Sequence, residues 1–439
     1  MEVERCTSRF QDLCSRFLVD EKSFTIQYYA YYNARLKLMY PWLEASARNK
    51  WGKDVTIVSL SDLTTKSGEK VCVIGTLFKR MDLQPTILKE LSEEHQLIPQ
   101  PLMEKYTSEE DVLYLQDNRE SVRLMGTLNV KSFVTGISVA LLGYEDDDGN
   151  NFIVEDYCLP IFLDYVERPL TISGDKYVAI ISDIGFSLRS NVNLISARNM
   201  FRDFVTGNTH FKINEDKAGK IVKVIVAGNC VSREVRILEQ QENQKNLLSW
   251  NKKVRPFTLE IMQMIDNFLV TLGKFVDVDV MPGNHDVTSG MLPQQPIHPC
   301  LLPKSSVFES VRCVTNPYSA KFDNVLFLGT SGQNVDSIRQ YSSYDDTLEI
   351  MEKTLLWRHI APTAPDTLQS YPFADKDPFV LHECPHVYFA GNQTTFNTKL
   401  HKGPNGQLTR IIAVPQFESS FNCILVNLRN LDCELVAFG

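Results

Sequence analysis

The sequence lacks the short motifs that mark many metal-binding, membrane and secreted proteins. Its ten cysteines are scattered from Cys6 to Cys433 without a Cys-x-x-Cys pair, which argues against a zinc ribbon or a thioredoxin-like redox site. No stretch approaches the roughly 18 apolar residues of a membrane helix. The residues after Met1 do not include the apolar run of a signal peptide. We therefore expect reduced thiols in a cytosolic or nuclear protein and no membrane contact.

Positive charge is also scarce. The chain carries 45 Lys and Arg against 54 Asp and Glu, a net charge of −9 at pH 7. Because duplex binding draws most of its affinity from cations that neutralise phosphates, we do not expect this chain alone to bind nucleic acid tightly. No Lys/Arg cluster of the nuclear-import type is visible, so entry into the nucleus would need a partner or a dispersed signal.

The sequence contains enough hydrophobic residues to form a sizeable core. Hydrophobic residues make up 43% and charged residues 23% of its 439 residues, which is typical of globular proteins. Residues 22–50 predict a helix capped by Ser23, because apolar and aromatic residues recur at three- and four-residue spacing. Four tyrosines lie between residues 28 and 32. This helix either packs on its own domain, which we favour, or faces a partner, since aromatic residues are enriched at interfaces.

Residues 69–157 consist of short predicted strands. Gly75 and Gly126 each precede Thr-Leu inside such a strand and indicate bends in a small curved barrel. About five strands of this kind suit an OB-fold, a fold that often binds single-stranded nucleic acid. An acidic turn between Glu145 and Asn151 predicts a hairpin. Because this turn is acidic and the strands offer few exposed aromatics, we favour a protein-contact or structural role for the barrel.

From residue 175 onward, buried strands each run into a loop of small and polar residues. The predicted strands lie at residues 176–181, 221–227, 276–281, 325–328 and 386–390, and a closing hairpin at 423–427 and 434–438. We expect these loops to converge on one edge of the sheet, where α/β proteins place ligand sites. In the third strand, valines alternate with aspartates, which predicts one apolar face toward the core.

The loop after that third strand reads Gly283-Asn284-His285-Asp286. It resembles the third signature of the calcineurin-like metallophosphoesterases, which hold two divalent ions. On its own the segment also fits a tight turn with a hydrogen-bonded histidine. Two dications about 3.5–4 Å apart need a bridging carboxylate and several imidazoles. The remaining signatures of the phosphoesterases, Asp-x-His, Gly-Asp-x-x-Asp, a lone His and Gly-His-x-His, therefore decide whether the resemblance implies an enzyme.

In the first two signatures most of these ligands are replaced. Asp183 is kept, but Gly185 stands at the histidine position. Asn229 stands at the position of the bridging aspartate and Ser232 at that of the later aspartate. An amide at the bridging position removes a negative charge between two dications, and no neighbouring residue in the sequence restores it.

The third signature is intact, but Asn392 and Thr394 replace both histidines of the last one. The surviving residues cannot complete even one metal site, so we expect no bound metal, no cofactor and no catalytic residue. The resemblance then implies only a vestigial phosphoesterase site, made of Asp183, Asn229, Asn284, His285 and Asn392.

Five further blocks narrow the resemblance. They are residues 292–300 (LPQQPIHPC), 315–318 (TNPY), 329–334 (GTSGQN), 359–368 (HIAPTAPDTL) and 384–392 (CPHVYFAGN). Each proline-rich block alone could be a rigid turn. Together, and in this order, they resemble the small (B) subunits of replicative DNA polymerases from about residue 22 to the end.

This resemblance implies an α/β protein in which an OB-fold β-barrel packs on an inactivated calcineurin-like phosphoesterase domain, a β-sandwich flanked by helices. The implied domains are an N-terminal helical segment at 1–50, the OB-fold at 51–165 and the inactive phosphoesterase-like domain at 166–439. His285 is a departure, since members of this family can lose it.

The function implied is that of a non-catalytic accessory subunit in the nucleus. It would join the C-terminal metal-binding region of a catalytic polymerase subunit to a third, clamp-binding subunit, and would reach the sliding clamp and DNA through the complex. The partner-binding residues cannot be read from the spacing. Two alternatives stay open: a metal-dependent nuclease or phosphoesterase, since an archaeal relative of this class is an active nuclease, and a single-stranded DNA-binding barrel.

Overall fold

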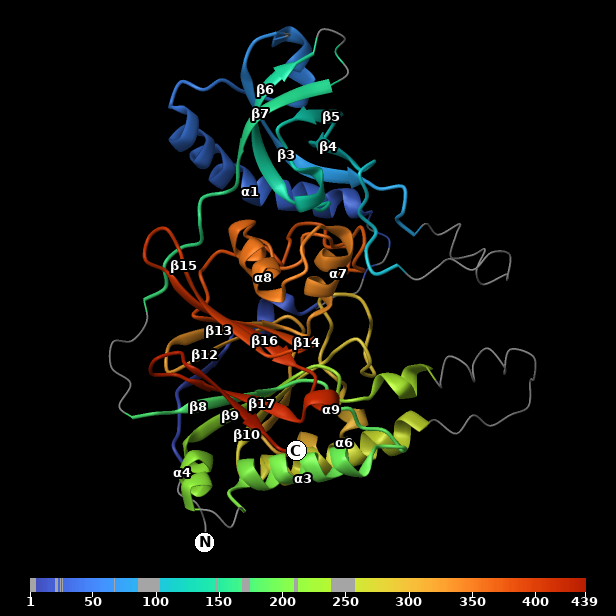
Figure 1. The fold of residues 1–439 in the computed structure, drawn as a ribbon, viewed down its shortest axis with the longest axis vertical. Coiled ribbons are helices and arrows are strands. Elements are labelled where there is room, and N and C mark those ends of the chain that lie inside the picture. Colours follow the sequence, from blue (N-terminus) through green and yellow to red (C-terminus); the bar gives the residue numbers. More distant parts are fainter. Residues whose placement is uncertain are drawn as a thin grey trace, which may run out of the picture. The chain divides into compact units, whose positions relative to one another are not determined.

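The computed structural model describes residues 5–19, 23, 25, 27–66, 68–85, 103–146, 149, 151–167, 174–208, 212–237 and 257–439. The chain forms two compact units, each built from segments that are distant in the sequence (Figure 1). Unit 1 comprises Met1–Glu21, Tyr165–Gln333 and Cys384–Gly439, and unit 2 comprises Lys22–Asp164 and Asn334–Glu383. Unit 2 spans the predicted boundary at residue 50 and includes Asn334–Glu383 of the predicted third domain, whereas its first segment ends at Asp164, next to the predicted boundary at 165. The three-part division therefore stays a prediction about which segments fold independently.

The strands of unit 2 form a closed barrel. They are β2 (Ile57–Val58), β3 (Val71–Arg80), β4 (Val112–Gln116), β5 (Ser121–Gly126), β6 (Ser138–Glu145) and β7 (Asn151–Cys158). Their order is β2-β3-β4-β5-β7-β6, and an additional pairing of β3 with β6 closes the ring. The ring consists of β3, β4, β5, β7 and β6, and its described pairs are antiparallel except β5 with β7. Strand β2 lies outside the ring and pairs parallel with β3. This Greek-key ring agrees with the barrel predicted from the sequence. Residues 147, 148 and 150 of the predicted acidic turn lie outside the described residues.

Both strand glycines lie where neighbouring backbones come too close for a side chain. A Cβ atom on Gly126, which has φ of 112°, would lie 2.3 Å from the carbonyl oxygen of Val154. On Gly75 it would lie 2.6 Å from the carbonyl oxygen of Gln116. Both glycines are therefore at sites of close backbone approach, and the bends predicted there stay a prediction.

Helix α1 (Tyr28–Trp51) packs against β3, β6 and β7 of the barrel. Its buried face includes Leu36, Met39, Leu43 and Ala47. The prediction that Ser23 caps this helix is wrong, because the helix begins after Gln27, which makes no side-chain cap bond. The expectation that α1 packs on its own unit is confirmed for this face.

Unit 2 also contains α8 (Thr347–Leu356), most of α7 (Gln333–Tyr341) and the irregular segment that follows them. Arg35 of α1 is fully buried and reaches into that segment. Its Nε atom lies 2.7 Å from Asp377 Oδ2, and its terminal nitrogens donate to the carbonyl oxygens of Pro362 (2.9 Å) and Ala364 (2.6 Å). His359 Nε2 lies 2.8 Å from the same Asp377 oxygen. One buried guanidinium thus ties α1 to chain more than 300 residues away.

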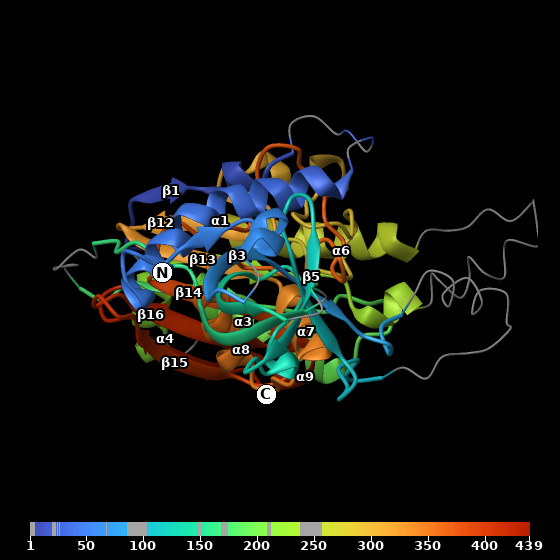
Figure 2. The ribbon, with the colours of Figure 1, turned by 90° about the horizontal axis from the view of Figure 1, so that it is seen from above.

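Unit 1 contains two six-stranded sheets. The first has the order β1-β12-β13-β14-β16-β15, which Figure 2 shows in succession. Its strands are β1 (Phe10–Asp12), β12 (Tyr318–Phe322), β13 (Val325–Thr330), β14 (Val387–Gln393), β15 (Asn397–Lys402) and β16 (Leu408–Pro415). The second has the order β11-β10-β9-β8-β17-β18. Its strands are β8 (Tyr177–Ile181), β9 (Ile221–Ala227), β10 (Asp277–Met281), β11 (Val311–Cys313), β17 (Asn422–Asn427) and β18 (Cys433–Ala437).

The two sheets face each other across a common apolar core. Ile180 and Ile225 of the second sheet belong to the same buried cluster as Phe327, Phe389 and Ile412 of the first. Full burial of each such side chain contributes about 1.5–3 kcal/mol to folding. Unit 1 is therefore a β-sandwich.

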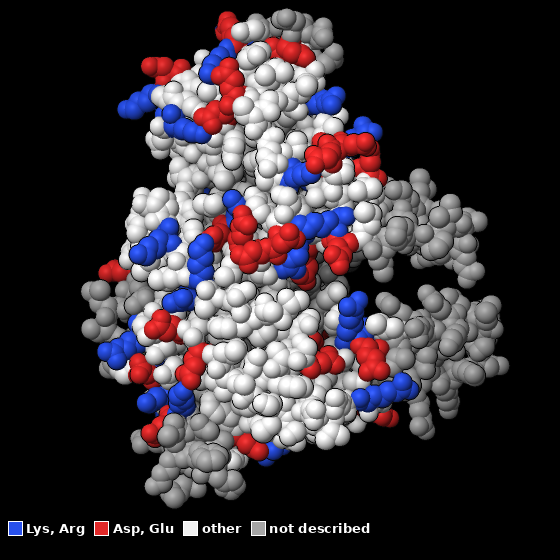
Figure 3. Space-filling view, in the orientation of Figure 1, with Lys and Arg blue, Asp and Glu red and all other residues white. Residues whose placement is uncertain are grey.

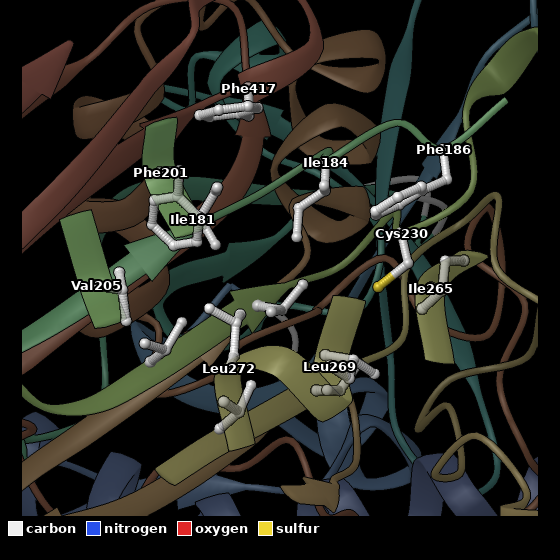
Figure 4. Close-up of a cluster of buried hydrophobic side chains, with 14 of the residues drawn as sticks. Ile181, Ile184, Phe186, Phe201, Val205, Cys230, Ile265, Leu269, Leu272 and Phe417 are labelled. Carbon is white, nitrogen blue, oxygen red and sulfur yellow. The ribbon is translucent and has the colours of Figure 1, made fainter. Parts of the chain in front are cut away.

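Helices cover the outer face of the second sheet. Those in this layer are α3 (Val192–Thr206), α4 (Lys212–Lys220) and α6 (Phe257–Gly273). Phe201 from α3 and Leu269 and Leu272 from α6 pack in one cluster with Ile181 and Cys230 (Figure 4). Among the helices that the structure describes, none has the length and apolarity needed to cross a bilayer.

The predicted strands of the α/β region and the closing hairpin are confirmed, the hairpin as the antiparallel pair β17 and β18. The prediction that their loops share one edge of a single sheet is wrong. Strands β8, β9 and β10 lie in one sheet, whereas β13 and β14 lie in the other. The loops nevertheless meet, because the carboxyl ends of these strands point to the same end of the sandwich.

Candidate functional site

Three of the predicted site residues adopt left-handed backbone conformations at strand ends. The φ angles are 53° at Asp183, 56° at Asn229 and 59° at Asn392. Asp and Asn adopt this conformation more readily than other residues with a side chain. The Asp183 N–H donates to the carbonyl oxygen of Gly228 (2.9 Å), and the Asn392 N–H donates to Ser182 Oγ (2.9 Å). Loops from both sheets are thus bonded directly to one another.

The amide of Asn229 holds the loop that follows β10. Its Oδ1 atom accepts a hydrogen bond from the His285 N–H at 3.1 Å. A Cβ atom on Gly283 would lie 2.3 Å from the same oxygen, so only glycine fits there. Asp286 is buried and accepts from the N–H groups of Val231 (3.0 Å) and Gly283 (2.8 Å). Asn229, at the position of the bridging aspartate, therefore holds the loop after β10 in place.

Glu418 fills the space beside Gly185. A Cβ atom on Gly185 would lie 2.7 Å from Glu418 Oε2 and 2.8 Å from its carboxyl carbon. Ser232 Oγ donates to Glu418 Oε1 at 2.8 Å, and the Glu418 N–H donates to the carbonyl oxygen of Asp183 at 2.9 Å. Two positions where the phosphoesterase signature expects metal ligands, 185 and 232, thus face one carboxylate from the short helix α9 (Phe417–Ser420).

Sequence reasoning missed Glu418. None of the phosphoesterase signatures extends to it, and it lies 233 residues after Gly185 in the chain. The available signal was weak: like the other loops of the site, Gln416 to Glu418 directly follows a buried strand, β16.

Acidic groups dominate the electrostatics of the site. Asp183 is only 6% exposed, and burial, together with the nearby Glu418 and Asp286, raises the pKa of its carboxyl to about 7. Burial also raises the pKa of Glu418 and of Asp286. Arg198 opposes this charge: its guanidinium attracts Glu418 and donates to the carbonyl oxygen of Gly185 at 3.5 Å. The site is thus a buried carboxyl cluster, with the Arg198 guanidinium beside Glu418.

His285 is neutral at pH 7. Burial first, and then the charges of Arg233 and Arg236, lower its pKa to about 4. Its Nδ1 atom, Asp183 Oδ1 and Asn392 Oδ1 are buried without a hydrogen-bond partner in the described part of the chain. Asn284 lies apart from this group, because its side chain is exposed and makes no hydrogen bond to a described residue.

These residues do not fit the two-metal centre of a phosphoesterase. Among the described residues, no group of three or more His, Cys, Asp or Glu side chains could hold a metal ion. Asn392 stands at a histidine position of the signature, and its Nδ2 atom donates to the carbonyl oxygen of Ser331 at 2.7 Å. Thr394 is exposed. We therefore derive no reaction step through metal ions at this site.

The outer face of the barrel offers a different kind of surface. Phe78 of β3 lies opposite Tyr114 of β4, with ring centroids 6.4 Å apart, and Tyr114 lies opposite Arg123 of β5. Both rings are half-buried. Figure 3 shows Lys and Arg interspersed with Asp and Glu over the visible face, without a broad area of one sign. Aromatic rings are therefore present, and the face drawn in Figure 3 shows no broad basic area of the kind that binds single strands.

Two family models match the chain. The model of the OB-fold domain of the DNA polymerase delta subunit matches residues 27–157, and the model of the B subunit of DNA polymerases alpha and epsilon matches residues 178–398. These matches place the chain in the class of B subunits of DNA polymerases. They also support the interpretation of the barrel as an OB-fold.

Similar proteins from other organisms support the same class. DNA polymerase delta subunit 2 of Drosophila melanogaster is 36% identical over 442 residues, covering 100% of this chain and 99% of that protein. DNA polymerase delta small subunits of Arabidopsis thaliana and Saccharomyces cerevisiae are 38% and 30% identical, covering 99% and 95% of this chain and 97% and 90% of those proteins. The chain therefore belongs to the family of DNA polymerase delta small subunits. The five sequence blocks predicted a small subunit of DNA polymerase delta, and these relatives confirm that prediction.

Proposed function

We propose that this chain is a non-catalytic accessory subunit of DNA polymerase delta that joins two other subunits. It would hold the C-terminal metal-binding region of the catalytic subunit and, at the same time, a third, clamp-binding subunit. It would act in the nucleus during replication and repair synthesis, and reach the sliding clamp and DNA only through the complex. Membership of the small-subunit family supports this role.

One observation carries the non-catalytic part of the proposal: Glu418 fills the space beside Gly185. The sandwich of unit 1, with its ligand-type residues on strand-end loops, supports descent from a calcineurin-like phosphoesterase. In such an enzyme a histidine imidazole would project from position 185. Here it could not enter without displacing Glu418, whose carboxylate bonds Ser232. The vestigial site of Asp183, Asn229, Asn284, His285 and Asn392 would then serve loop structure only.

A metal-dependent nuclease is the alternative that the retained Asp183 and His285 favour. The direct check is elemental analysis after dialysis against manganese, combined with a nuclease assay on single-stranded DNA. We expect no stoichiometric metal and no cleavage. Two ions per chain, with cleavage abolished by His285→Ala, would replace the scaffold proposal with an enzyme.

The joining role is tested by co-expression of all three chains and pull-down on the third subunit. We expect the catalytic subunit to be recovered only when this chain is present. The matched control omits this chain and keeps the other two at the same level. Equal recovery of the catalytic subunit in the control would show that no bridge exists.

A further inference from the structure

Unit 2 contains a groove that the proposed joining role does not yet explain. It lies along one face of α1 and has a volume of about 640 Å³, between that helix, strand β2 and the turn after β4. A smaller hollow of about 250 Å³ adjoins it and shares Asn33, Leu36, Asp117 and Asn118 in its lining. The larger volume is within the ~300–1,000 Å³ typical of ligand sites.

The larger hollow has a mixed lining that includes an apolar part and one tyrosine. Leu36, Ile57 and Ile74 line it, and Tyr40 on its rim is 40% exposed. Tyr29, which lines the smaller hollow and is 59% exposed, donates from its Oη atom to the carbonyl oxygen of Asn118 (3.3 Å), a residue that lines both hollows. Tyr29 belongs to the tyrosine cluster at residues 28–32, for which the sequence left a partner-facing role open. Exposed aromatics beside an apolar hollow are typical of protein interfaces.

Two cations and one carboxylate line this hollow. Lys37 and Arg119 line it, are exposed, and form no side-chain ion pair or hydrogen bond with any described residue. The one carboxylate in its lining, Asp117, is satisfied by the N–H groups of Leu60 (3.2 Å), Arg119 (2.8 Å) and Glu120 (2.9 Å). Two cations therefore stand without partners in the described structure beside apolar surface. Asp366 lines only the smaller hollow.

We propose that this groove binds an extended acidic segment of a partner protein. An apolar side chain of that segment would cover Leu36, Ile57 and Ile74, and its carboxylates would pair with Lys37 and Arg119. The proposal rests on the proposed function only in requiring a protein partner. A nucleic-acid strand fits less well, because the hollow pairs an apolar lining with just two cations, whereas strand-binding grooves follow the backbone with many.

The chemistry of the occupant can be read by site-specific photocrosslinking. The full chain carrying p-benzoylphenylalanine in place of Tyr40 is assembled with the catalytic and third subunits, irradiated, and the crosslinked peptides are identified by mass. Tyr144, 37% exposed on β6, is the control position because its residue type and exposure match. We expect position 40 to capture a net acidic peptide of a partner subunit that position 144 does not capture. Capture of a basic peptide, DNA or a second copy of this chain, or no capture, overturns the proposal.

The charge pairing is tested by the double variant Lys37→Glu/Arg119→Glu. Since like charges across an interface oppose binding, we expect the captured subunit to bind this variant about tenfold or more weakly. The control variant Lys53→Glu/Lys402→Glu makes the same kind of charge reversal at exposed positions outside the groove and should bind like the wild type. Unchanged binding of the groove variant, or an equal loss in the control, overturns the proposal. If the wild-type chain itself joins no subunits, it is the proposed function that fails, so the two failures are distinguishable.

Discussion

Asp183 lies beside the carboxyl groups of Glu418 and Asp286, and its pKa is raised to about 7. An unfolded chain would release the same proton near pH 3.8. Because the folded pKa is the higher one, the folded state binds more protons than the unfolded state between these values. Asp183 therefore costs stability progressively as the pH rises from about 4 to about 7.

Replacement of Asp183 by asparagine should remove this pH-dependent cost. Asparagine tolerates the left-handed backbone at this position, so the change should introduce no new strain. We expect Asp183→Asn to be the more stable protein at pH 8, by up to about 4 kcal/mol, with a smaller difference at pH 5. Urea unfolding at the two pH values measures this. A variant that is less stable than the wild type at pH 8 would mean that the carboxylate has a favourable partner there.

The reverse change at Asn229 should be harmful. Asn229→Asp adds a fourth acid beside Asp183, Asp286 and Glu418, and burying an unpaired charge costs about 1–3 kcal/mol or more. We expect the loss of stability relative to the wild type to be larger at pH 8 than at pH 5, because the new carboxyl is protonated at the lower pH. Added manganese should not restore the loss.

Asn284→Asp is the matched control for this experiment. It makes the same chemical change in the neighbouring signature, but on an exposed side chain, and should alter the free energy of unfolding by less than about 0.5 kcal/mol. Full rescue of Asn229→Asp by manganese would show that a metal position survives.

At the scale of single elements, α1 depends on one guanidinium. Arg35 satisfies Asp377 and three carbonyl groups inside unit 2, and the pKa of Asp377 is lowered because His359 and Arg35 stabilise its charge. Arg35→Met keeps much of the side-chain volume but leaves this buried carboxylate short of a partner. We expect a loss of about 3–5 kcal/mol in the free energy of unfolding.

The control for this loss is Arg48→Met on the same helix. Arg48 pairs with Glu44 on the surface, 42% and 38% exposed, so its removal should cost less than about 1 kcal/mol. Chemical denaturation, and limited proteolysis of α1 and of the segment that Arg35 contacts, would compare the two variants. Equal losses would indicate that the helix is held by its apolar face alone.

The elements themselves could be predicted from the sequence, since periodicity reports burial of a strand or helix face. Contacts between distant elements could not. The alternation around β10 predicted one apolar face, yet Asp279 on the other face is also fully buried. It pairs with Lys223 and Arg312 and accepts from the hydroxyl of Tyr318. Glu418 was missed for the same reason: its role arises only where chain from β16 meets the loop after β8.

At the scale of the whole molecule, the net charge of −9 predicts weak contact with DNA. Figure 3 shows charges of both signs interspersed on the face that it draws. We expect the isolated chain to bind single-stranded DNA with a Kd no tighter than the ~10⁻⁴–10⁻⁶ M of non-specific contacts at physiological salt. Fluorescence anisotropy over a salt series would measure it. Nanomolar affinity with a steep salt dependence would favour the DNA-binding barrel.

The interleaving of the two units has a consequence for synthesis on the ribosome. Residues 22–164 are made early, but Asp377, the partner of Arg35, is made much later. In unit 1, strand β13 pairs with β14, which in turn pairs with the still later β16. Unit 2 has its last segment once Glu383 is made, whereas unit 1 also needs Cys384–Gly439. Both cores therefore stay open until the last quarter of the chain is being translated, and unit 2 can close before unit 1.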